Sequence, residues 1–165
     1  MVFLGILGTR NSLTKQIIQN EILNPILDDL EKPIRRVLLP DDALSSTYIE
    51  SWATRNDIPV ELFKSDWTAN GKRAGVVRDY EIERRSSALL VFEGPRSRYY
   101  LDRAEKIAKK NPNCPVYVVA ANSVTPVLLD VEPEHSITEK EEKDILTIPM
   151  MFAKNATKCL INDEV

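Results

Sequence analysis

The chain is poor in the residues that build metal centres and disulfide frameworks. Its 165 residues include only two cysteines and one histidine. Cys114 and Cys159 are too few for a disulfide framework or a cysteine-ligated metal, and free thiols are typical of a reducing compartment. His135 lies in an acidic C-terminal stretch, which argues against histidine ligation and against histidine acid–base catalysis in the core. We therefore expect no metal and no cofactor.

Long hydrophobic runs are also missing. No stretch approaches the roughly 20 apolar residues of a membrane span. The N-terminus lacks the basic segment and apolar core of a secretory signal. We expect a cytoplasmic protein that does not contact membranes, and the host cytoplasm would be its compartment if the source is a virus.

The charge is modest in total but unevenly distributed. The net charge is −3, yet residues 72–110 hold 11 Lys and Arg against 6 Asp and Glu. Residues 130–165 hold 4 Lys against 9 Asp and Glu. The acidic total argues against generic nucleic-acid binding, which favours a basic surface. A polyanionic ligand would bind at the basic part, although two solvated helices rich in Arg and Lys explain it equally well.

Short apolar runs alternate with helical patterns as far as residue 120. Strands are predicted at residues 2–7, 34–39, 58–63, 87–92 and 115–119, and helices at 12–23, 45–55, 74–86 and 98–110. Five short β-branched runs separated by helices favour a parallel sheet covered on both faces. Right-handed crossovers then give a Rossmann-like, doubly wound α/β fold over residues 1–122.

The remaining residues, 123–165, are expected to form a small C-terminal extension packed on the same domain. Residues 125–131 have the pattern of a sixth strand, and residues 138–141 have the form of a capping box that begins a short helix. A last strand or edge element is expected at 156–161. Pro25 is expected to interrupt the first helix, because proline lacks the N–H that a helix interior needs.

Polar or glycine-bearing loops follow four of the predicted strands. In a parallel sheet these loops meet at the edge where the strands end, which is where ligands bind in such folds. The candidate ligand-binding residues in them are Gly8, Thr9, Arg10, Ser45, Ser46, Lys72, Arg73, Gly75, Arg78, Gly94, Arg96, Ser97 and Arg98.

Residues 66–78 are the most informative segment. They hold two of the five glycines together with Lys72, Arg73 and Arg78. A glycine-flexed loop of this kind brings backbone N–H groups and cations onto an anion. Simpler roles remain open: Arg78 can form a salt bridge with Asp79 or Glu81, and Lys72 and Arg73 can act by electrostatic steering alone. Trp67 is expected to anchor the loop to the core.

These residues, in this order, resemble the SLOG superfamily, and within it the small YspA-like proteins. The resemblance covers about residues 2–120. It rests on four segments: Gly8-Thr9-Arg10, the helix with Trp52-Ala53 that leads to residues 57–60, the stretch from Asp66-Trp67 to Arg78, and Gly94 to Arg98. It implies a Rossmann-like domain that senses or processes a nucleotide-derived ligand. Relatives include the lonely-guy phosphoribohydrolases and the Smf/DprA DNA-processing proteins.

The chain departs from that family after the second predicted strand. The family's Gly-Gly-Ala-Arg-Gly-Ala-Asp loop is replaced by residues 40–46, which contain two aspartates and no glycine. The aspartates repel phosphate, whereas Ser45, Ser46 and Thr47 still offer hydroxyls at a helix N-terminus. Arg78-Asp79 replaces the family's Arg-Asn. Tyr99 and Tyr100 stand where relatives carry glycine, and they suit stacking on a base, core packing or an oligomer interface.

Three functions remain open. The first is a non-catalytic sensor or sequestering protein for a nucleotide-derived ligand, such as a cyclic nucleotide or an ADP-ribose-type molecule. The second is a nucleotide N-glycosidic hydrolase using a carboxylate among Glu50, Glu81 and Glu93, although the lonely-guy motif Pro-Gly-Gly-x-Gly-Thr-x-x-Glu is absent. The third is a nucleic-acid binder, which the acidic balance disfavours. The exposed aromatics favour a homo-oligomer.

Overall fold

A computed structural model of the chain describes residues 1–8, 12–41, 44–95 and 97–132. The chain divides into two units, Met1–Pro133 and Glu134–Val165, and the described residues all belong to the first. Several expectations lie outside the described residues: those for Thr9, Arg10, Arg96, His135 and Cys159, for the helix start at 138 and for the last strand at 156–161.

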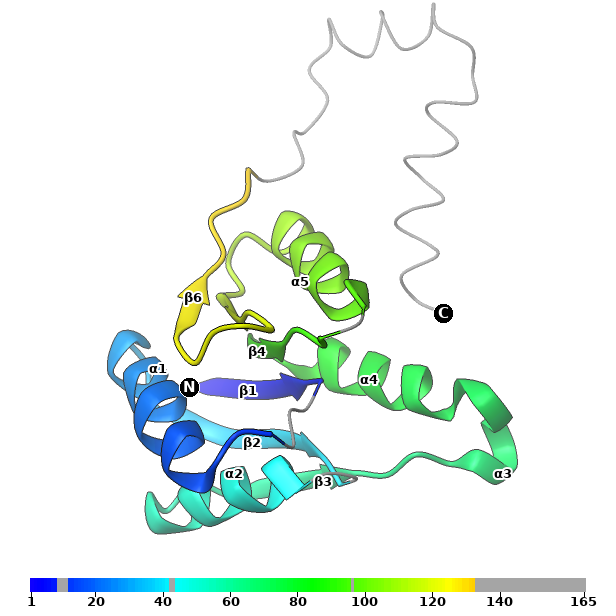
Figure 1. Cartoon of the computed structure of the whole chain (residues 1–165), viewed down its shortest axis with the longest axis horizontal. Coiled ribbons are helices and arrows are strands. Elements are labelled where there is room, and N and C mark those ends of the chain that lie inside the picture. Colours follow the sequence, from blue (N-terminus) through cyan, green and yellow to red (C-terminus); the bar gives the residue numbers. More distant parts are fainter. Residues whose placement is uncertain (9–11, 42–43, 96, 133–165) are drawn as a thin grey trace, which may run out of the picture. The chain divides into compact units, whose positions relative to one another are not determined.

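A six-stranded sheet in the order β3-β2-β1-β4-β5-β6 forms the centre of the first unit (Figure 1). The strands are β1 (Val2–Leu7), β2 (Ile34–Pro40), β3 (Val60–Phe63), β4 (Ala88–Phe92), β5 (Val116–Val119) and β6 (Pro126–Leu128). The first five are parallel, and β6 pairs antiparallel with β5. The predicted α/β fold with a parallel sheet is confirmed, and the pattern at 125–131 does give a sixth strand.

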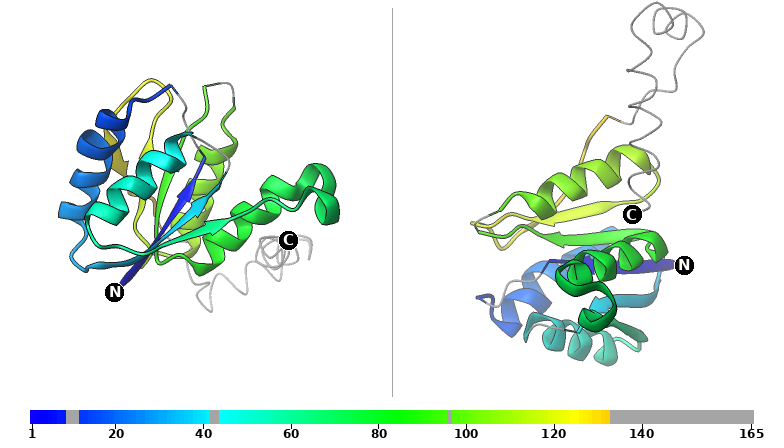
Figure 2. Two further views of the ribbon diagram at one scale, coloured as in Figure 1. Left: turned by 90° about the horizontal axis from the view of Figure 1, so that it is seen from below. Right: turned by 90° about the vertical axis from the view of Figure 1, so that its right-hand side faces the viewer.

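Helices cover both faces of the sheet, as Figure 2 shows. The π-helical segment η1 (Ile17–Leu23), α1 (Asn24–Asp29) and α2 (Leu44–Arg55) pack on one face. On the other face lie α4 (Ala74–Arg85) and α5 (Tyr99–Lys110). Two further elements, α3 (Trp67–Asn70) and the 3-10 turn η2 (Gly71–Arg73), precede α4.

Alternation along the strands divides the core into two layers. In β4, Leu90 and Phe92 pack with η1, α1 and α2, whereas Leu89 and Val91 pack with α4 and α5. All five residues of β4 are buried. A strand covered on both faces needs apolar residues at every position, which is why its sequence reads as a continuous apolar run.

The helix is not interrupted at Pro25, where the sequence predicted a break: residues 15–29 are helical throughout. Pro25 lies in the first turn of α1, directly after the π-helical turns of η1. Because proline has no N–H, it cannot donate to the carbonyl four residues earlier. The helix changes from π-helical to α-helical turns next to this residue and continues to Asp29.

None of the helices among the described residues is both long and apolar enough to span a bilayer.

Candidate functional site

The strand order reverses between β1 and β4, and this is where a parallel sheet opens a crevice for a ligand. From β1 the chain passes through η1 and α1 to β2, whereas from β4 it passes through α5 to β5 on the other side of the sheet. Gly8 follows β1, and Glu93 and Gly94 follow β4. We call the side of the sheet where β1 to β5 end the carboxyl edge.

Gly8 is enclosed at this reversal. Its backbone has a φ of +68°, and a Cβ atom there would lie 2.5 Å from the carbonyl oxygen of Phe92 and 3.2 Å from the ring of Tyr100. Only glycine fits such a position without strain. Gly8, directly after β1, therefore lies tightly against the end of β4 and against α5.

A tight turn follows β4 on the other side of the crevice. Gly94 and Ser97 form an isolated antiparallel bridge. The Ser97 hydroxyl accepts a hydrogen bond of 3.1 Å from the backbone N–H of Tyr99, which fixes the start of α5. Gly8, Gly94 and Ser97, all expected at the site, thus lie at the carboxyl ends of two adjacent strands.

The first turn of α2 contains two buried hydroxyl groups. Ser45 and Ser46 are 1% and 3% exposed, and among the described residues neither hydroxyl has a hydrogen-bond partner. A buried polar group without a partner costs roughly 1–3 kcal/mol, and the helix N-terminus beside it leaves backbone N–H groups unsatisfied. Because α2 follows β2, both hydroxyls lie toward the carboxyl edge.

Arg78 lies in a buried polar network. Its guanidinium is paired with the Asp79 carboxylate at 3.1 Å and donates to the Ser65 hydroxyl at 3.1 Å. The Tyr100 hydroxyl donates to the second Asp79 oxygen at 2.9 Å. The structural alternative for Arg78, an ion pair with Asp79, is therefore present. The network joins the chain after β3 to α4 and α5.

Burial raises the pKa of the Tyr100 hydroxyl, and the negative charge of Asp79 raises it further. The hydroxyl is therefore protonated and acts as a donor. The ring of Tyr100 lies 3.2 Å from where a Cβ atom on Gly8 would be, so this network borders the end of β1.

Residues 66–78 do not form the glycine-flexed loop that the sequence predicted. They form α3, η2 and the start of α4, because Asp66 caps α3 by accepting a hydrogen bond of 3.0 Å from the N–H of Ala69. Gly71, with a φ of +55°, ends α3, whereas Gly75 lies inside α4. The expectation that Trp67 anchors this segment to the core is wrong, since the residue is 63% exposed.

The basic residues of this part of the chain are not gathered at the crevice. Lys72 and Arg73 are exposed on η2, which lies beyond the end of β3 (Figure 1). Arg98 forms exposed ion pairs with Asp102 at 3.5 Å and Glu105 at 3.9 Å on the surface of α5.

The three candidate carboxylates lie on different elements. Glu50 is exposed on α2, and Glu81 pairs with Arg84 at 2.8 Å on α4. Glu93 directly follows β4 and accepts a hydrogen bond of 3.4 Å from the N–H of Ala121. Of the three, Glu93 is therefore the one at the carboxyl edge. Within the described ranges, no cluster of three or more His, Cys, Asp and Glu side chains suits a metal ion.

The sequence did not predict the polar network around Arg78. Asp79 and Tyr100 were noted separately, and Ser65 was not noted at all. Ser65 lies 13 residues before Arg78, and Tyr100 lies 21 residues after Asp79. No periodicity relates such positions, so only the packing of α4 and α5 brings them together.

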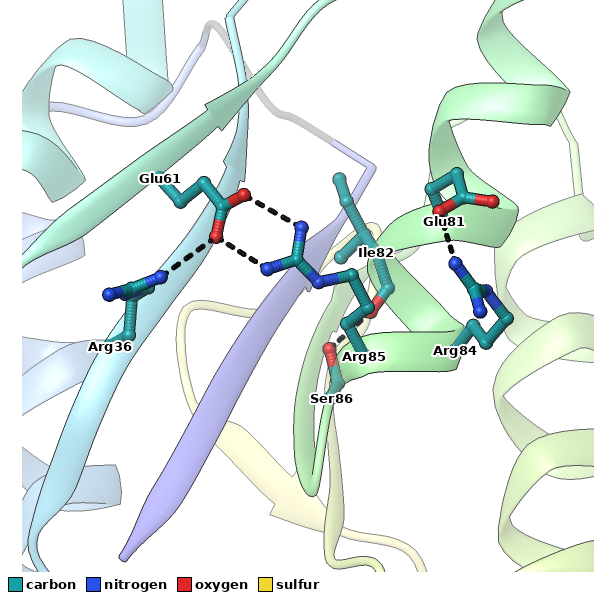
Figure 3. A network of polar contacts seen from close by, with 7 residues as sticks. All are labelled: Arg36, Glu61, Glu81, Ile82, Arg84, Arg85 and Ser86. Atoms are coloured by element: carbon teal, nitrogen blue, oxygen red, sulfur yellow. Dashed lines mark hydrogen bonds and ion pairs between the residues drawn. The ribbon is translucent and has the colours of Figure 1, made fainter.

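A second polar cluster, also missed, ties α4 to the edge of the sheet (Figure 3). Arg85 donates two hydrogen bonds to Glu61, at 2.7 and 2.9 Å, and Arg36 donates one at 3.2 Å. The Arg85 guanidinium also lies 5.2 Å from the ring centre of Phe63. Hydrogen bonds from Arg85 chiefly lower the pKa of Glu61. The cluster links β2, β3 and the last turn of α4.

Three surface hollows lined by described residues lie at the opposite edge, around the turn between α5 and β5. Cys114 lies in this turn as a free thiol, and burial raises its pKa to about 11. The predicted site residues do not line these hollows.

Comparison with known proteins gave no match to any family model, to any curated protein or to any solved structure. The chain is therefore identified by its architecture alone, as an α/β protein with a mostly parallel six-stranded sheet.

Proposed function

We propose that this chain binds a nucleotide or nucleotide-derived ligand at the carboxyl edge, as a sensor or sequestering protein. The observation that carries the proposal is the pair of buried hydroxyls of Ser45 and Ser46, which have no partner in the first turn of α2. An acceptor-rich group such as a phosphoryl oxygen would satisfy both hydroxyls and the N–H groups of the same turn.

The charges near α2 favour a ligand of low charge. Asp41 is exposed three residues before α2 begins, and its carboxylate repels a multiply charged phosphate chain. Lys72 and Arg73 are held away on η2, and Arg78 is paired with Asp79. A cyclic nucleotide or an ADP-ribose-type molecule therefore fits this edge better than a nucleoside triphosphate.

The family resemblance supports the same choice. Gly8 and Gly94, two of the residues that resemble the SLOG superfamily, flank the reversal of strand order. That resemblance implies a nucleotide-derived ligand in a crevice built from these loops. The serines of α2 then replace the glycine-rich loop of the family as the source of hydrogen-bond donors.

Calorimetry against a panel of cyclic nucleotides, ADP-ribose and nucleoside mono- and triphosphates tests the proposal. We expect Ser45→Ala and Ser46→Ala each to weaken binding by about 10- to 100-fold, because each removes a donor to a charged acceptor. The unliganded variants should keep or slightly gain stability, since an unsatisfied buried hydroxyl has been removed.

Ser51→Ala, later on the same helix, is the matched control and should bind like the wild-type chain. Binding that is unchanged in the Ser45→Ala, Ser46→Ala double variant would contradict the proposal, as would the absence of binding to every compound in the panel.

A hydrolase is the second candidate, because Glu93 lies at the carboxyl end of β4. An N-glycosidic hydrolase needs a carboxylate that positions water or stabilises an oxocarbenium-like transition state. Release of free base from a nucleoside monophosphate, abolished in Glu93→Gln, would favour this candidate. Ligand that is recovered intact after long incubation would favour the binder.

A further inference from the structure

We propose that two copies of this chain associate through strand β3, with a two-fold axis at Leu62 and an antiparallel β3–β3 pair that continues the sheet. The arm, defined as residues 64–77, then packs against the second copy. The proposal is independent of any ligand at the carboxyl edge.

The outer edge of β3 is open. β3 ends the strand order. The carbonyl groups of Pro59 and Phe63 accept hydrogen bonds from Val37 in β2, at 2.9 Å, and from Asp41 directly after β2, at 3.3 Å. Because backbone groups alternate in direction along a strand, the N–H and C=O groups of Val60, Leu62 and Lys64 face outward. Among the described residues, these outward groups have no partner.

The opposite edge of the sheet is less able to pair. In β6, the N–H of Leu129 donates to Val116 at 2.8 Å, so Val127 also faces β5, and Pro126 and Leu128 face outward. Proline has no N–H to offer, which is a common way of blunting an edge strand. Of the two edges, β3 is therefore the one whose outward-facing residues all carry an N–H group.

An antiparallel pair centred on Leu62 is self-complementary, as a two-fold interface requires. Each Leu62, 44% exposed, faces the Leu62 of the other copy. Val60 faces Lys64, and Glu61 faces Phe63. No like charges are directly opposed, although opposed like charges would destabilise such a pair. Leu62 in this register would exchange two backbone hydrogen bonds with its counterpart.

The arm has the exposed apolar surface that such an interface would cover. Trp67, Val76 and Val77 are 63%, 40% and 37% exposed, and no residue of α3 or η2 is buried. A helix as short as α3 is not stable on its own in water. Figures 1 and 2 show α3 beyond the end of β3, next to the start of α4 and away from the sheet.

The charges of the arm also fit a second copy. The antiparallel register carries the chain beyond Lys64 toward the residues before β3 of the second copy, where Asp57 is exposed. Lys72 and Arg73 give the arm a positive charge, opposite in sign to Asp57. Opposite charges across an interface favour association and fix its register.

Light scattering of the full chain in solution tests the proposal. We expect a mass of about twice the 18.7 kDa of one chain.

The Leu62→Pro variant removes the outward N–H of β3 but keeps the pairing of β3 with β2. It should therefore give a monomer with an unchanged circular dichroism spectrum. Leu128→Pro, the same change on the outward side of β6, should remain a dimer. Trp67→Ser should weaken the dimer by about tenfold or more, as expected for a large aromatic side chain that is covered in an interface.

Disulfide trapping gives a second, independent test. In a chain with both native cysteines replaced by serine, Leu62→Cys should form a covalent dimer under mild oxidation. The two Cα atoms of a hydrogen-bonded antiparallel pair are about 5.5 Å apart, within the range of a disulfide. Leu128→Cys is the matched control.

A wild-type chain that is monomeric up to about 100 μM, a concentration at which even a weak dimer would be detected, would overturn the proposal. A Leu62→Cys variant that cross-links no better than Leu128→Cys would overturn it as well. If Leu62→Pro fails to fold, the cysteine pair decides alone.

Discussion

Gly8 has no room for a side chain. Replacing it with alanine places a methyl group 2.5 Å from the Phe92 carbonyl oxygen at a φ of +68°. The left-handed backbone alone costs about 1–2 kcal/mol, so we expect Gly8→Ala to lower the free energy of unfolding by about 2 kcal/mol or more. Chemical denaturation measures this.

Gly75→Ala is the matched control, because the residue is inside α4 and, among the described residues, its added methyl group would meet no atom within 4 Å beyond the adjoining backbone of its own helix. Alanine in a helix should raise the stability by up to about 1 kcal/mol. Equal destabilisation by both substitutions would contradict the special role of Gly8.

Tyr100 provides a second prediction at the scale of residues. Tyr100→Phe removes the hydroxyl that donates to the half-buried network at Asp79. The carboxylate then lacks one donor, so we expect a loss of about 1–3 kcal/mol in the free energy of unfolding.

Tyr99→Phe keeps the edge-to-face contact between the two rings, whose centres are 5.1 Å apart. Tyr99 is 43% exposed, and its substitution should change the stability by less than about 0.5 kcal/mol. If the two variants were equally stable, the Asp79 hydrogen bond would have no energetic importance.

At the scale of elements, Glu61 and Arg85 attach α4 to the edge strand. The pKa of Glu61 is lowered from its ordinary value of 4.5, chiefly by hydrogen bonds from Arg85. A lowered pKa contributes stability above the ordinary pKa, and that contribution is lost as the pH falls through the folded-state pKa. Glu61→Gln should therefore cost about 1 kcal/mol or less at pH 7.

The difference between wild type and Glu61→Gln should shrink as the pH falls from 4.5 through the lowered pKa of folded Glu61, because below that pKa both side chains are uncharged. Thermal unfolding from pH 7 to pH 3 measures it. Glu81→Gln, whose partner Arg84 is 58% exposed on the same helix, is the control and should have a smaller effect. A difference that is independent of pH would exclude an ionic contribution of Glu61.

At the scale of the whole molecule, the two core layers share the same strands and should unfold together. Trp52 is 1% exposed and donates to Asn24 at 2.8 Å, whereas Trp67 is 63% exposed. In Trp67→Phe, the remaining tryptophan reports the core alone. Its fluorescence and the far-ultraviolet circular dichroism should give coincident urea transitions at one protein concentration. Separate transitions would mean that the two layers unfold independently.

The sequence predicted the regular elements well wherever the hydrophobic pattern was long. The run at 87–92 and the amphipathic pattern at 98–110 correspond to β4 and α5 with shifts of one residue at their starts. The stretch from residue 66 was predicted as a glycine-flexed loop leading into a helix at 74–86. That helix is present as α4, whereas residues 67–73 form α3 and η2 instead of a loop. The sequence pattern also misplaced Trp67, since a large aromatic residue is usually buried.

The sequence by itself determined the α/β class, the alternation of strands and helices, and the placing of glycines after β1 and β4. These follow from local periodicity and from the conformations that only glycine adopts. Tertiary structure alone decided which polar groups are paired: it joined Arg78 to Asp79, Ser65 and Tyr100, and it left the Ser45 and Ser46 hydroxyls without partners. The physical reason is that burial and hydrogen bonding depend on residues from separate elements, and only the packed sheet and helices set the distances between them.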